Sequence, residues 1–260
     1  MMTAPHRILD PQGGSQVPAG LCALAVMTKA PRAGRVKTRL TPPLTPEEAA
    51  ALNICFLRDT AAAISMTDKT SAQGVAAYTP VGAEDAYAGI LPDDFLLVPQ
   101  RGEAFGERLA AATEDLLQIG FASLCLINSD SPTVPADAFS LAVKHLAGAE
   151  DCVVLGPSDD GGYYLIGLKK LHRCLFDRID WSTERVLEQT IAAAREMDVR
   201  VHFLPTWYDI DDRATLARLC GELFGSNEGA GFDAPATRAF LNELLAREGR
   251  ARIWPNDSTT

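Results

Sequence analysis

The sequence predicts an α/β protein of three layers (α/β/α), in which a mainly parallel sheet lies between two layers of helices. Short apolar runs alternate along the chain with longer stretches of helical periodicity, which is typical of β-α-β units. Most strand-like runs are apolar at nearly every position, as in parallel strands that are covered on both faces. The 260 residues are enough for one such domain with a substantial core.

The elements can be placed in order along the chain. The first strand is expected at 21–27 (LCALAVM), and a helix follows from Thr45 to about Ile64. Thr45 can cap this helix, Pro46 suits its first position and Glu48 completes a capping box. The other expected strands are 74–79, 95–100, 124–129, 152–155, 163–168 and 201–205, and the other expected helices are 103–118, 136–147, 183–197, 214–224 and 234–247.

Both ends of the chain are expected to lie outside the folded domain. Residues 1–20 are rich in Gly, Pro and Gln and lack the apolar core of a signal peptide, so we expect a flexible extension. Residues 249–260 are expected to form a frayed tail. No repeat, low-complexity block or linker divides residues 21–248, which we expect to form a single domain.

Composition narrows the class of protein. The net charge of −10 argues against general binding to nucleic acid or to anionic membranes. No apolar run approaches the roughly 20 residues that a membrane-spanning helix needs. The 6 cysteines form no CxxC pair, which favours free thiols in a reducing cytoplasm over disulfides or a zinc site. We therefore expect a soluble cytoplasmic protein.

A basic loop follows the first strand and is the local exception in this acidic chain. No acidic residue occurs between Thr28 and Pro46, and the loop carries Lys29, Arg32, Arg35, Lys37 and Arg39. Phosphates favour Arg forks, Lys charges and backbone amides, and Pro31 and Gly34 can turn those amides inward. The glycine spacing matches neither a Walker A loop nor GxGxxG. We expect a phosphate-binding loop, and the alternative is a solvated basic loop.

Two acidic motifs also follow expected strands. Asp130, in Asn128-Ser-Asp-Ser-Pro132, is well placed to hold a divalent cation, although it could instead cap the next turn. In Tyr208-Asp-Ile-Asp-Asp212, Asp209 and Asp211 share a face of an extended chain. Asp211 is the preferred second metal ligand, and the alternative is that Asp211 or Asp212 caps the following helix.

A glycine-rich turn, Gly156-Pro-Ser-Asp-Asp-Gly-Gly-Tyr-Tyr164, joins two expected strands. Asp159 or Asp160 could contact acceptor hydroxyls or act as a base, with the neighbouring Gly161, Gly162 and Tyr163 facing the substrate. The alternative is a β-turn without further function. Trp181 could line a sugar or base pocket, but we expect a core position. All these motifs follow strand ends, where open α/β sheets bind ligands.

In order, the strings KAPRAGRVKTRL, LTPEEAA, SDSP, GPSDDGGYYLIGL and YDIDD resemble the bacterial glycosyltransferase-A-like family of nucleotide-diphospho-sugar transferases. The chain is more distantly similar to 2-phospho-lactate guanylyltransferase. The basic loop of that family ends in Lys-Ser-Arg-Leu, where this chain has Lys37-Thr-Arg-Leu40. One departure is Asn128-Ser129-Asp130, where relatives commonly have Gly-Thr-Asp.

The resemblance implies a nucleotide-diphospho-sugar transferase (GT-A, Rossmann-like) fold. It further implies that a divalent metal, Mg²⁺ or Mn²⁺, binds Asp130 and Asp211. The residues that it implies for the nucleotide phosphates are Lys29, Arg32, Lys37 and Arg39.

Three functions are compatible with these residues. In a glycosyltransferase, the metal and the basic loop stabilise a departing nucleoside diphosphate, and Asp160 is the best candidate for a base. In a nucleotidyltransferase, an acceptor phosphate attacks an NTP and releases pyrophosphate, so no base is required. The third function is nucleotide binding without catalysis. We expect a nucleotide or nucleotide-sugar donor and a small-molecule acceptor as partners, and we leave open whether the chain forms a homodimer.

Overall fold

The computed structural model describes residues 6–225 and 231–253. Within them a 7-stranded sheet has the order β3-β2-β1-β4-β6-β5-β7, and β6 runs antiparallel to its neighbours β4 and β5 while the other pairs are parallel. The strands are β1 (Cys22–Lys29), β2 (Ala72–Thr79), β3 (Leu96–Pro99), β4 (Ser123–Ile127), β5 (Cys152–Pro157), β6 (Tyr163–Leu168) and β7 (Arg200–Phe203). The expected three-layer α/β class with a mainly parallel sheet is confirmed.

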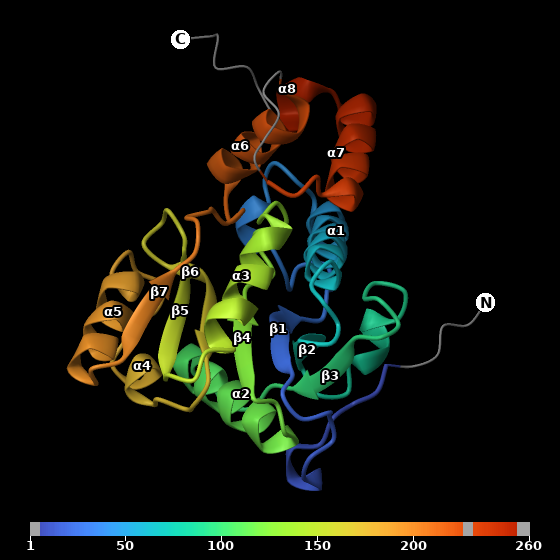
Figure 1. The fold of residues 1–260 in the computed structure, drawn as a ribbon. Helices are drawn as coiled ribbons and strands as arrows, with labels where there is room; N and C mark the ends of the chain where they lie inside the picture. Colours follow the sequence, from blue (N-terminus) through green and yellow to red (C-terminus); the bar gives the residue numbers. More distant parts are fainter. Residues whose placement is uncertain (1–5, 226–230, 254–260) are drawn as a thin grey trace.

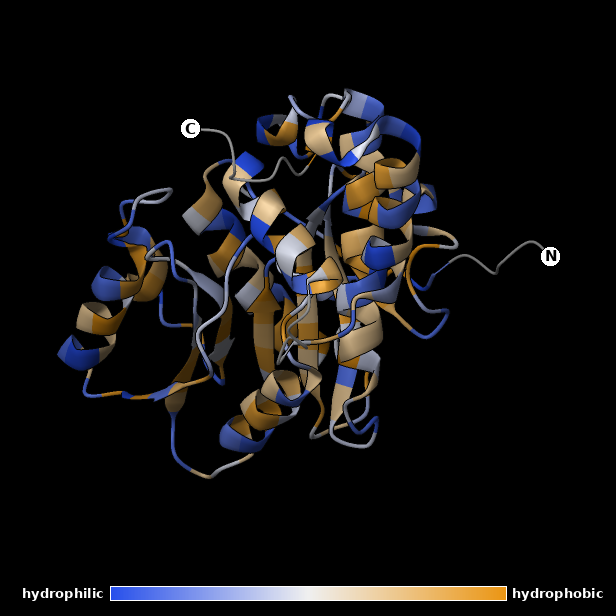
Figure 2. Cartoon of the chain, turned by 90° about the horizontal axis from the view of Figure 1, so that it is seen from above, coloured by the Kyte–Doolittle hydropathy of each residue, from blue (hydrophilic) through white to orange (hydrophobic). Residues whose placement is uncertain are grey.

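Helices cover both faces of the sheet (Figure 1). Their bounds are α1 (Pro46–Ser65), α2 (Phe105–Ile119), α3 (Ala136–Leu146), α4 (Cys174–Asp177), α5 (Val186–Glu196), α6 (Arg213–Phe224), α7 (Pro235–Glu248) and α8 (Arg250–Ile253). Short 3-10 turns are η1 (Pro11–Gly13), η2 (Thr38–Leu40) and η3 (Glu84–Tyr87). The apolar colouring of the strands and of the inward sides of the helices in Figure 2 locates the core between these layers.

Side chains alternate between the two faces of each strand, so the sheet separates two hydrophobic clusters. On β1, Leu24 and Val26 belong to the cluster beneath α1 and α3, whereas Ala23, Ala25 and Met27 belong to the cluster beneath α2, α4 and α5. A third cluster joins Leu40 and α1 to the C-terminal helices α6, α7 and α8, which gather at one end of the molecule (Figure 1). Leu40 directly follows the last basic residue of the loop, so its burial in this third cluster fixes the end of the basic loop.

The capping box that begins α1 is confirmed. The Thr45 hydroxyl accepts a hydrogen bond from the Glu48 amide at 3.2 Å, and the Glu48 carboxylate accepts one from the Thr45 amide at 2.9 Å. The expected β5–β6 hairpin is present as well. All six cysteines are free, as expected, and five of them are buried.

Two helices differ from the expected pattern. The helix expected at 183–197 begins only at Val186, because Ser182 is left-handed (φ 63°) and the residues up to Arg185 form turns. The short helix α4, Cys174–Asp177, was not expected, and it buries Leu175 and Phe176 against the sheet. A four-residue helix has too few positions to show periodicity in a sequence.

The two chain ends follow defined paths where the structure describes them. Leu9 is 1% exposed, and its amide donates to the Leu97 carbonyl at 2.8 Å. The Gln16 amide donates to the Ile119 carbonyl, also at 2.8 Å, so the stretch 6–20, expected to be flexible, packs beside β3 and α2. At the other end, the expected tail contributes α8, whose Ile253 is buried. Residues 1–5 and 254–260 of the two expected ends lie outside the described residues.

Among the described residues, no helix combines the length and apolar character needed to cross a membrane.

Candidate active site

A cavity of about 640 Å³ opens at the carboxyl ends of β1 and β4. Because β6 is antiparallel, its first residue, Tyr163, reaches the same edge of the sheet. The β5–β6 turn, the segment before α5 and the β7–α6 loop complete the lining. The motifs that follow separate strands in the sequence therefore meet around one cavity.

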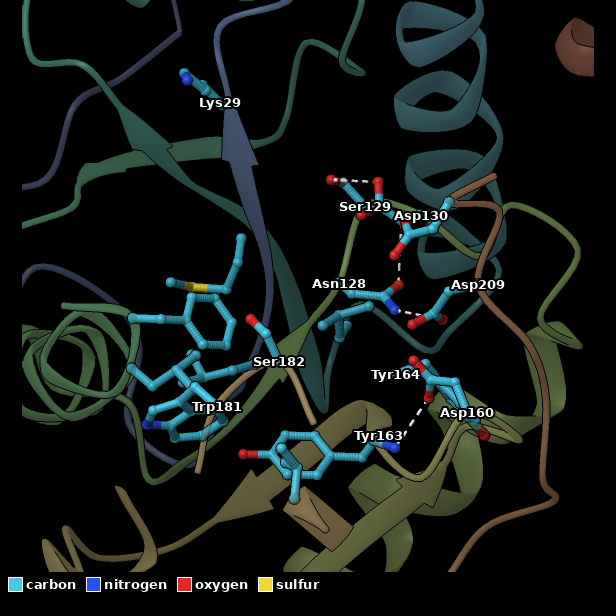
Figure 3. Close-up of a pocket in the computed structure, with 18 of the residues that line it drawn as sticks. Lys29, Asn128, Ser129, Asp130, Asp160, Tyr163, Tyr164, Trp181, Ser182 and Asp209 are labelled. Atoms are coloured by element: carbon cyan, nitrogen blue, oxygen red, sulfur yellow. Dashed lines mark hydrogen bonds between the residues drawn. The ribbon is translucent and has the colours of Figure 1, made fainter. Parts of the chain in front are cut away.

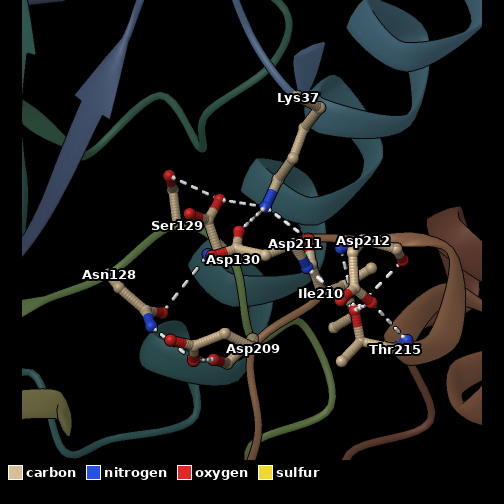
Figure 4. Close-up of polar contacts among 10 residues, drawn as sticks. Lys37, Asn128, Ser129, Asp130, Asp209, Ile210, Asp211, Asp212 and Thr215 are labelled. Carbon is tan, nitrogen blue, oxygen red and sulfur yellow. Dashed lines mark hydrogen bonds and ion pairs between the residues drawn. The ribbon is translucent and has the colours of Figure 1, made fainter. Parts of the chain in front are cut away.

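Lys37 is the centre of the polar part of this cavity (Figure 4). Its ammonium group lies 2.7 Å from a carboxylate oxygen of Asp130 and 3.3 Å from one of Asp211, and it donates to the Ile210 carbonyl at 2.7 Å. The Lys37 side chain is only 5% exposed and packs over the Phe56 ring, with 5.4 Å from its nitrogen to the ring centroid. The basic loop and both expected metal ligands thus converge on one point.

Asp209 is held by two polar side chains from the loop after β4. Its Oδ1 accepts hydrogen bonds from the Asn128 amide at 2.7 Å and the Ser131 hydroxyl at 2.5 Å (Figure 4). Burial, helped by the negative charges of Asp130 and Asp160 and opposed by the two hydrogen bonds, raises the pKa of Asp209 to about 6. Asp209 therefore links the loop after β4 to the β7–α6 loop.

The two ends of the Tyr208–Asp212 motif have different roles. Asp211 faces Lys37, whereas the Asp212 side chain caps α6 by accepting from the Thr215 amide at 2.8 Å. The helix-cap interpretation of this motif therefore applies to Asp212, while Asp211 faces the cavity. The Ile210 amide donates to the Asp130 carbonyl at 2.9 Å, which ties the motif to the end of β4.

The basic loop contributes only part of its expected residues to the cavity. Lys29, Lys37 and Arg39 line it, and so does Arg35, which was not singled out as a site residue. Pro31, Arg32 and Gly34 are outside the lining. The Arg35 amide donates to the Arg32 carbonyl at 2.9 Å and Gly34 is left-handed (φ 69°), so these residues shape a turn that carries Arg35 to the cavity.

The paired aspartates of the β5–β6 turn point to different places. Asp160 lines the cavity and accepts from the Gly162 amide at 2.9 Å, whereas Asp159 forms an ion pair with Arg218 on α6 and is outside the lining. Gly161 is left-handed (φ 88°), and a Cβ there would lie 2.1 Å from the Glu184 carbonyl oxygen. This glycine lets the turn lie against the segment before α5, while Gly162 and Tyr163 line the cavity.

The cavity also has an aromatic side (Figure 3). Trp181, for which we expected a core position, lines it and is only partly buried. Its ring makes edge contacts with Phe105 (centroids 5.0 Å apart) and Tyr163 (6.4 Å). A tryptophan in a loop gives no periodicity that would reveal its direction, so sequence reasoning could not separate core from pocket here.

Two further residues of the site were missed. Asn128 was noted only as part of a motif, although it anchors Asp209. Asn53 of α1 lines the cavity at 4% exposure, and its side-chain oxygen has no hydrogen-bond partner among the described residues. An Asn on the buried side of an expected helix, between apolar neighbours, was the available signal for Asn53.

The residues present fit a divalent cation. No group of three or more His, Cys, Asp or Glu that could hold a metal occurs in the described part of the chain. Two carboxylates, Asp130 and Asp211, nevertheless contact the same ammonium group, which shows that both can reach one cation. Hard cations such as Mg²⁺ bind through one or two carboxylates and complete their shell with phosphates and water.

Comparison with solved structures places this arrangement in a class. A protein from Desulfovibrio desulfuricans G20, described as a "putative nucleotide-diphospho-sugar transferase", matches with a TM-score of 0.75 and 28% sequence identity. The match covers 89% of this chain and 99% of that one. The chain therefore has a nucleotide-diphospho-sugar transferase fold, and the expected resemblance is confirmed.

A family model also matches part of the chain. Residues 61–183 match the family DUF2064, described as an uncharacterized protein conserved in bacteria. The matched segment contains Asp130, Asp160 and Trp181, but neither the basic loop nor Asp211. No curated protein matches the chain significantly.

A weaker structural match is a cytidylyltransferase from Leptospira borgpetersenii serovar Hardjo-bovis (TM-score 0.48, 13% identity, 94% of this chain and 100% of that one).

Proposed function

We propose that this chain is a divalent-metal-dependent transferase that uses a nucleotide-activated donor, an NDP-sugar, and transfers its sugar to a small-molecule acceptor. One observation carries the proposal: Lys37 of the basic loop meets Asp130 and Asp211 in the lining of a cavity. Cationic side chains and metal-binding carboxylates in one place are what a diphosphate leaving group requires. The fold shared with the Desulfovibrio protein supports the same class.

The cationic and the acidic side chains of the cavity have different proposed roles. The diphosphate would lie against Lys29, Arg35, Lys37 and Arg39, whose charges stabilise the negative charge that develops on the leaving group. Asp130 and Asp211 would hold Mg²⁺ or Mn²⁺, which supplies further charge neutralisation when bound. Lys37 must then exchange its two carboxylate partners for phosphate oxygens, which are also acceptors for its ammonium group.

Asp160 is the proposed base for an acceptor hydroxyl. It lines the cavity from the β5–β6 turn, and one of its oxygens is held by the Gly162 amide. This hydrogen bond fixes the direction of the carboxylate, as a base in reach of an acceptor requires. Gly162 and Tyr163 follow it in the lining and would contact the acceptor.

Nucleotidyl transfer is the second candidate function. It is favoured by the four cationic side chains in the cavity, because an attacking phosphate is already ionised and needs charge stabilisation without a base. The products separate the two reactions. Glycosyl transfer releases a nucleoside diphosphate, and nucleotidyl transfer releases pyrophosphate.

The decisive test combines binding with product analysis. We expect one nucleotide or NDP-sugar to raise the melting temperature only with Mg²⁺ or Mn²⁺ present, because a ligand that binds the native state stabilises it. The same ligand is then incubated with acceptor pools, and nucleoside diphosphate and pyrophosphate are quantified. If no nucleotide shifts the melting temperature with either metal, the proposed function is wrong.

Asp130→Asn tests the metal-binding carboxylate. The amide keeps the shape but removes the charge, so we expect the metal-dependent shift to disappear and turnover to fall by about 100-fold or more. Asp93→Asn is the matched control, since Asp93 is exposed and outside the cavity lining. Full turnover in Asp130→Asn would show that the reaction does not depend on a metal held by Asp130.

A further inference from the structure

One side of the cavity is lined by apolar and aromatic side chains rather than by charged ones. We call it the apolar wall, and it consists of Met27, Phe105, Leu109, Tyr163, Trp181 and Val186. These residues come from β1, α2, β6 and α5, and from the segment before α5. Figure 3 shows Trp181 and Tyr163 apart from the polar group formed by Asn128, Asp130 and Asp209.

The apolar wall continues into the core between the sheet and α2 and α5. Leu109 and Val186 are 3% and 6% exposed, and the buried Leu126 and Ile166 also line the cavity. Phe105 stands at the rim with 52% of its surface exposed, although it packs edge-on against Trp181. Phe105 therefore extends the apolar lining of the cavity outward, where a bound hydrocarbon group would cover it.

The main ring of the apolar wall is held in place before any ligand arrives. Trp181 Nε1 donates to the Phe176 carbonyl at 3.3 Å. The ring lies so close to Gly106 that a Cβ there would be 2.5 Å from Nε1. The next residue, Ser182, is left-handed (φ 63°) and lines the cavity as well, so the chain turns sharply directly after the ring. A fixed aromatic ring binds with little loss of conformational entropy.

The apolar wall offers few polar partners to a ligand. Its indole N–H already has an acceptor, and its only hydroxyl, that of Tyr163, is buried and has no hydrogen-bond partner among the described residues, so it could serve few ligand groups. A sugar carries a hydroxyl on most of its carbons, and each hydroxyl buried without a partner costs free energy. A hydrocarbon group needs no such partner and gains from leaving water.

We propose that the acceptor is amphipathic: a hydroxyl or phosphate that reacts in the polar half of the cavity, attached to a hydrocarbon group that lies on the apolar wall. This inference rests on the proposed transferase function and names the substrate class of the same site. The polar head is placed among the cationic side chains and Asp160, and the hydrocarbon group extends past Met27 toward Trp181.

Alkyl phosphates test this directly, because their heads are identical and only the chain differs. Methyl, butyl and octyl phosphate are titrated into the nucleotide-free protein by calorimetry, below the concentrations at which octyl phosphate aggregates. We expect affinity to rise roughly two- to four-fold for each methylene that reaches the apolar wall. Equal affinities for the three probes would overturn the inference.

Phe105 is the best position for a variant, since it is 52% exposed and its side chain contributes little to the core. Phe105→Ser should lower the gain from methyl to octyl phosphate by about 10-fold, and Phe105→Leu should restore most of it. Met66→Ser is the matched control, because Met66 is 68% exposed and outside the cavity lining. A chain-length gain that is the same in Phe105→Ser and Met66→Ser would also overturn the inference.

A parallel arm separates this inference from the proposed function. The melting temperature is measured with the donor nucleotide and metal in the same variants. Nucleotide binding without a chain-length effect means that the transferase proposal survives and the amphipathic acceptor does not. If neither the wild type nor any of the variants binds the nucleotide, the proposed function itself is wrong.

Discussion

Lys37 has a left-handed backbone (φ 48°), which a non-glycine residue adopts only where its surroundings compensate for the strain. Here the compensation is local and visible: two carboxylates and one carbonyl all accept from its ammonium group. The strained backbone aims the side chain inward from a loop whose other cations are exposed. We therefore infer that the fold tolerates backbone strain at Lys37 because this conformation places its ammonium group beside the two carboxylates.

Lys37→Met should reduce turnover by about 100-fold, because it removes a positive charge that lies where the diphosphate is expected. Turnover is measured at saturating donor. Lys144→Met, on the exposed side of α3, is the matched control and should leave the rate unchanged. A Lys37→Met enzyme with wild-type turnover would show that Lys37 serves only to neutralise Asp130 and Asp211.

Two arginines of the basic loop make a second comparison. Arg39 lines the cavity and Arg32 does not, although the sequence assigns phosphate binding to both. Arg39→Gln should weaken nucleotide binding about 10-fold or more through the loss of a charge-assisted hydrogen bond, whereas Arg32→Gln should change it less than about two-fold. Calorimetric titration of the nucleotide with Mg²⁺ measures both. Equal losses would mean that the loop closes over the nucleotide.

Two glycines separate backbone strain from steric fit. Gly82 and Gly161 are both left-handed, but a Cβ at 82 meets nothing within 4 Å, whereas one at 161 would lie 2.1 Å from the Glu184 carbonyl. Gly82→Ala should cost about 1–2 kcal/mol of unfolding free energy. Gly161→Ala should cost roughly 1–3 kcal/mol more, because the turn and the segment before α5 must move apart. Urea denaturation measures both, and equal costs would show that the contact yields freely.

At the scale of elements, local signals in the sequence were reliable. The capping box at Thr45 and Glu48 involves residues three apart, and the glycine-rich turn sets the β5–β6 hairpin within ten residues. The convergence of Lys37 with Asp130 and Asp211 depends instead on the order of strands in the sheet, which no local pattern encodes. Only the rule that ligands bind at strand ends brought these residues together in advance.

The same reasoning explains the errors. Asp159 and Asp160 are adjacent and chemically equal, so the sequence could not tell which one faces the cavity and which pairs with Arg218. Likewise, the C-terminal segment that we expected to be a frayed tail contributes α8. Its Arg252 donates hydrogen bonds to Glu48 on α1, about two hundred residues earlier in the chain. Long-range partners of this kind are invisible to periodicity.

Glu48 links α1 to the C-terminal helices and gives these elements a pH dependence. Burial opposes its ionisation, but hydrogen bonds from Arg252 and the Thr45 amide outweigh burial and lower its pKa below the usual 4.5. The ionised form therefore stabilises the fold above pH 4.5, and this stabilisation is lost as the pH falls toward the lowered pKa.

Comparison with Glu48→Gln tests this linkage. The melting temperature of the wild type should exceed that of Glu48→Gln at pH 7, and the difference should shrink as the pH falls below about 4.5. Glu47→Gln, at the exposed neighbouring position, serves as the control. A difference that does not change with pH would mean that the carboxylate charge is not what ties the helices together.

At the scale of the molecule, we propose that residues 21–248 unfold as one unit. Leu40 and α1 share a core with α6, α7 and α8, so the C-terminal helices are not a separate body. Leu241→Ala, at a fully buried position on α7, should reduce the unfolding free energy by about 2–5 kcal/mol. Circular dichroism and tryptophan fluorescence should then report the same lowered urea midpoint. Two separate midpoints would indicate two folding units.

The ammonium group of Lys37 acts as a tethered counter-ion in the resting protein. It already pairs with both carboxylates, so if these bind magnesium as proposed, the free ion has to compete with a charge that never diffuses away. Phosphates that arrive together with the metal remove this competition, because they offer Lys37 a new partner at the moment it leaves the old ones. We therefore expect the metal and the nucleotide to enter as a complex, and the protein alone to be a poor chelator.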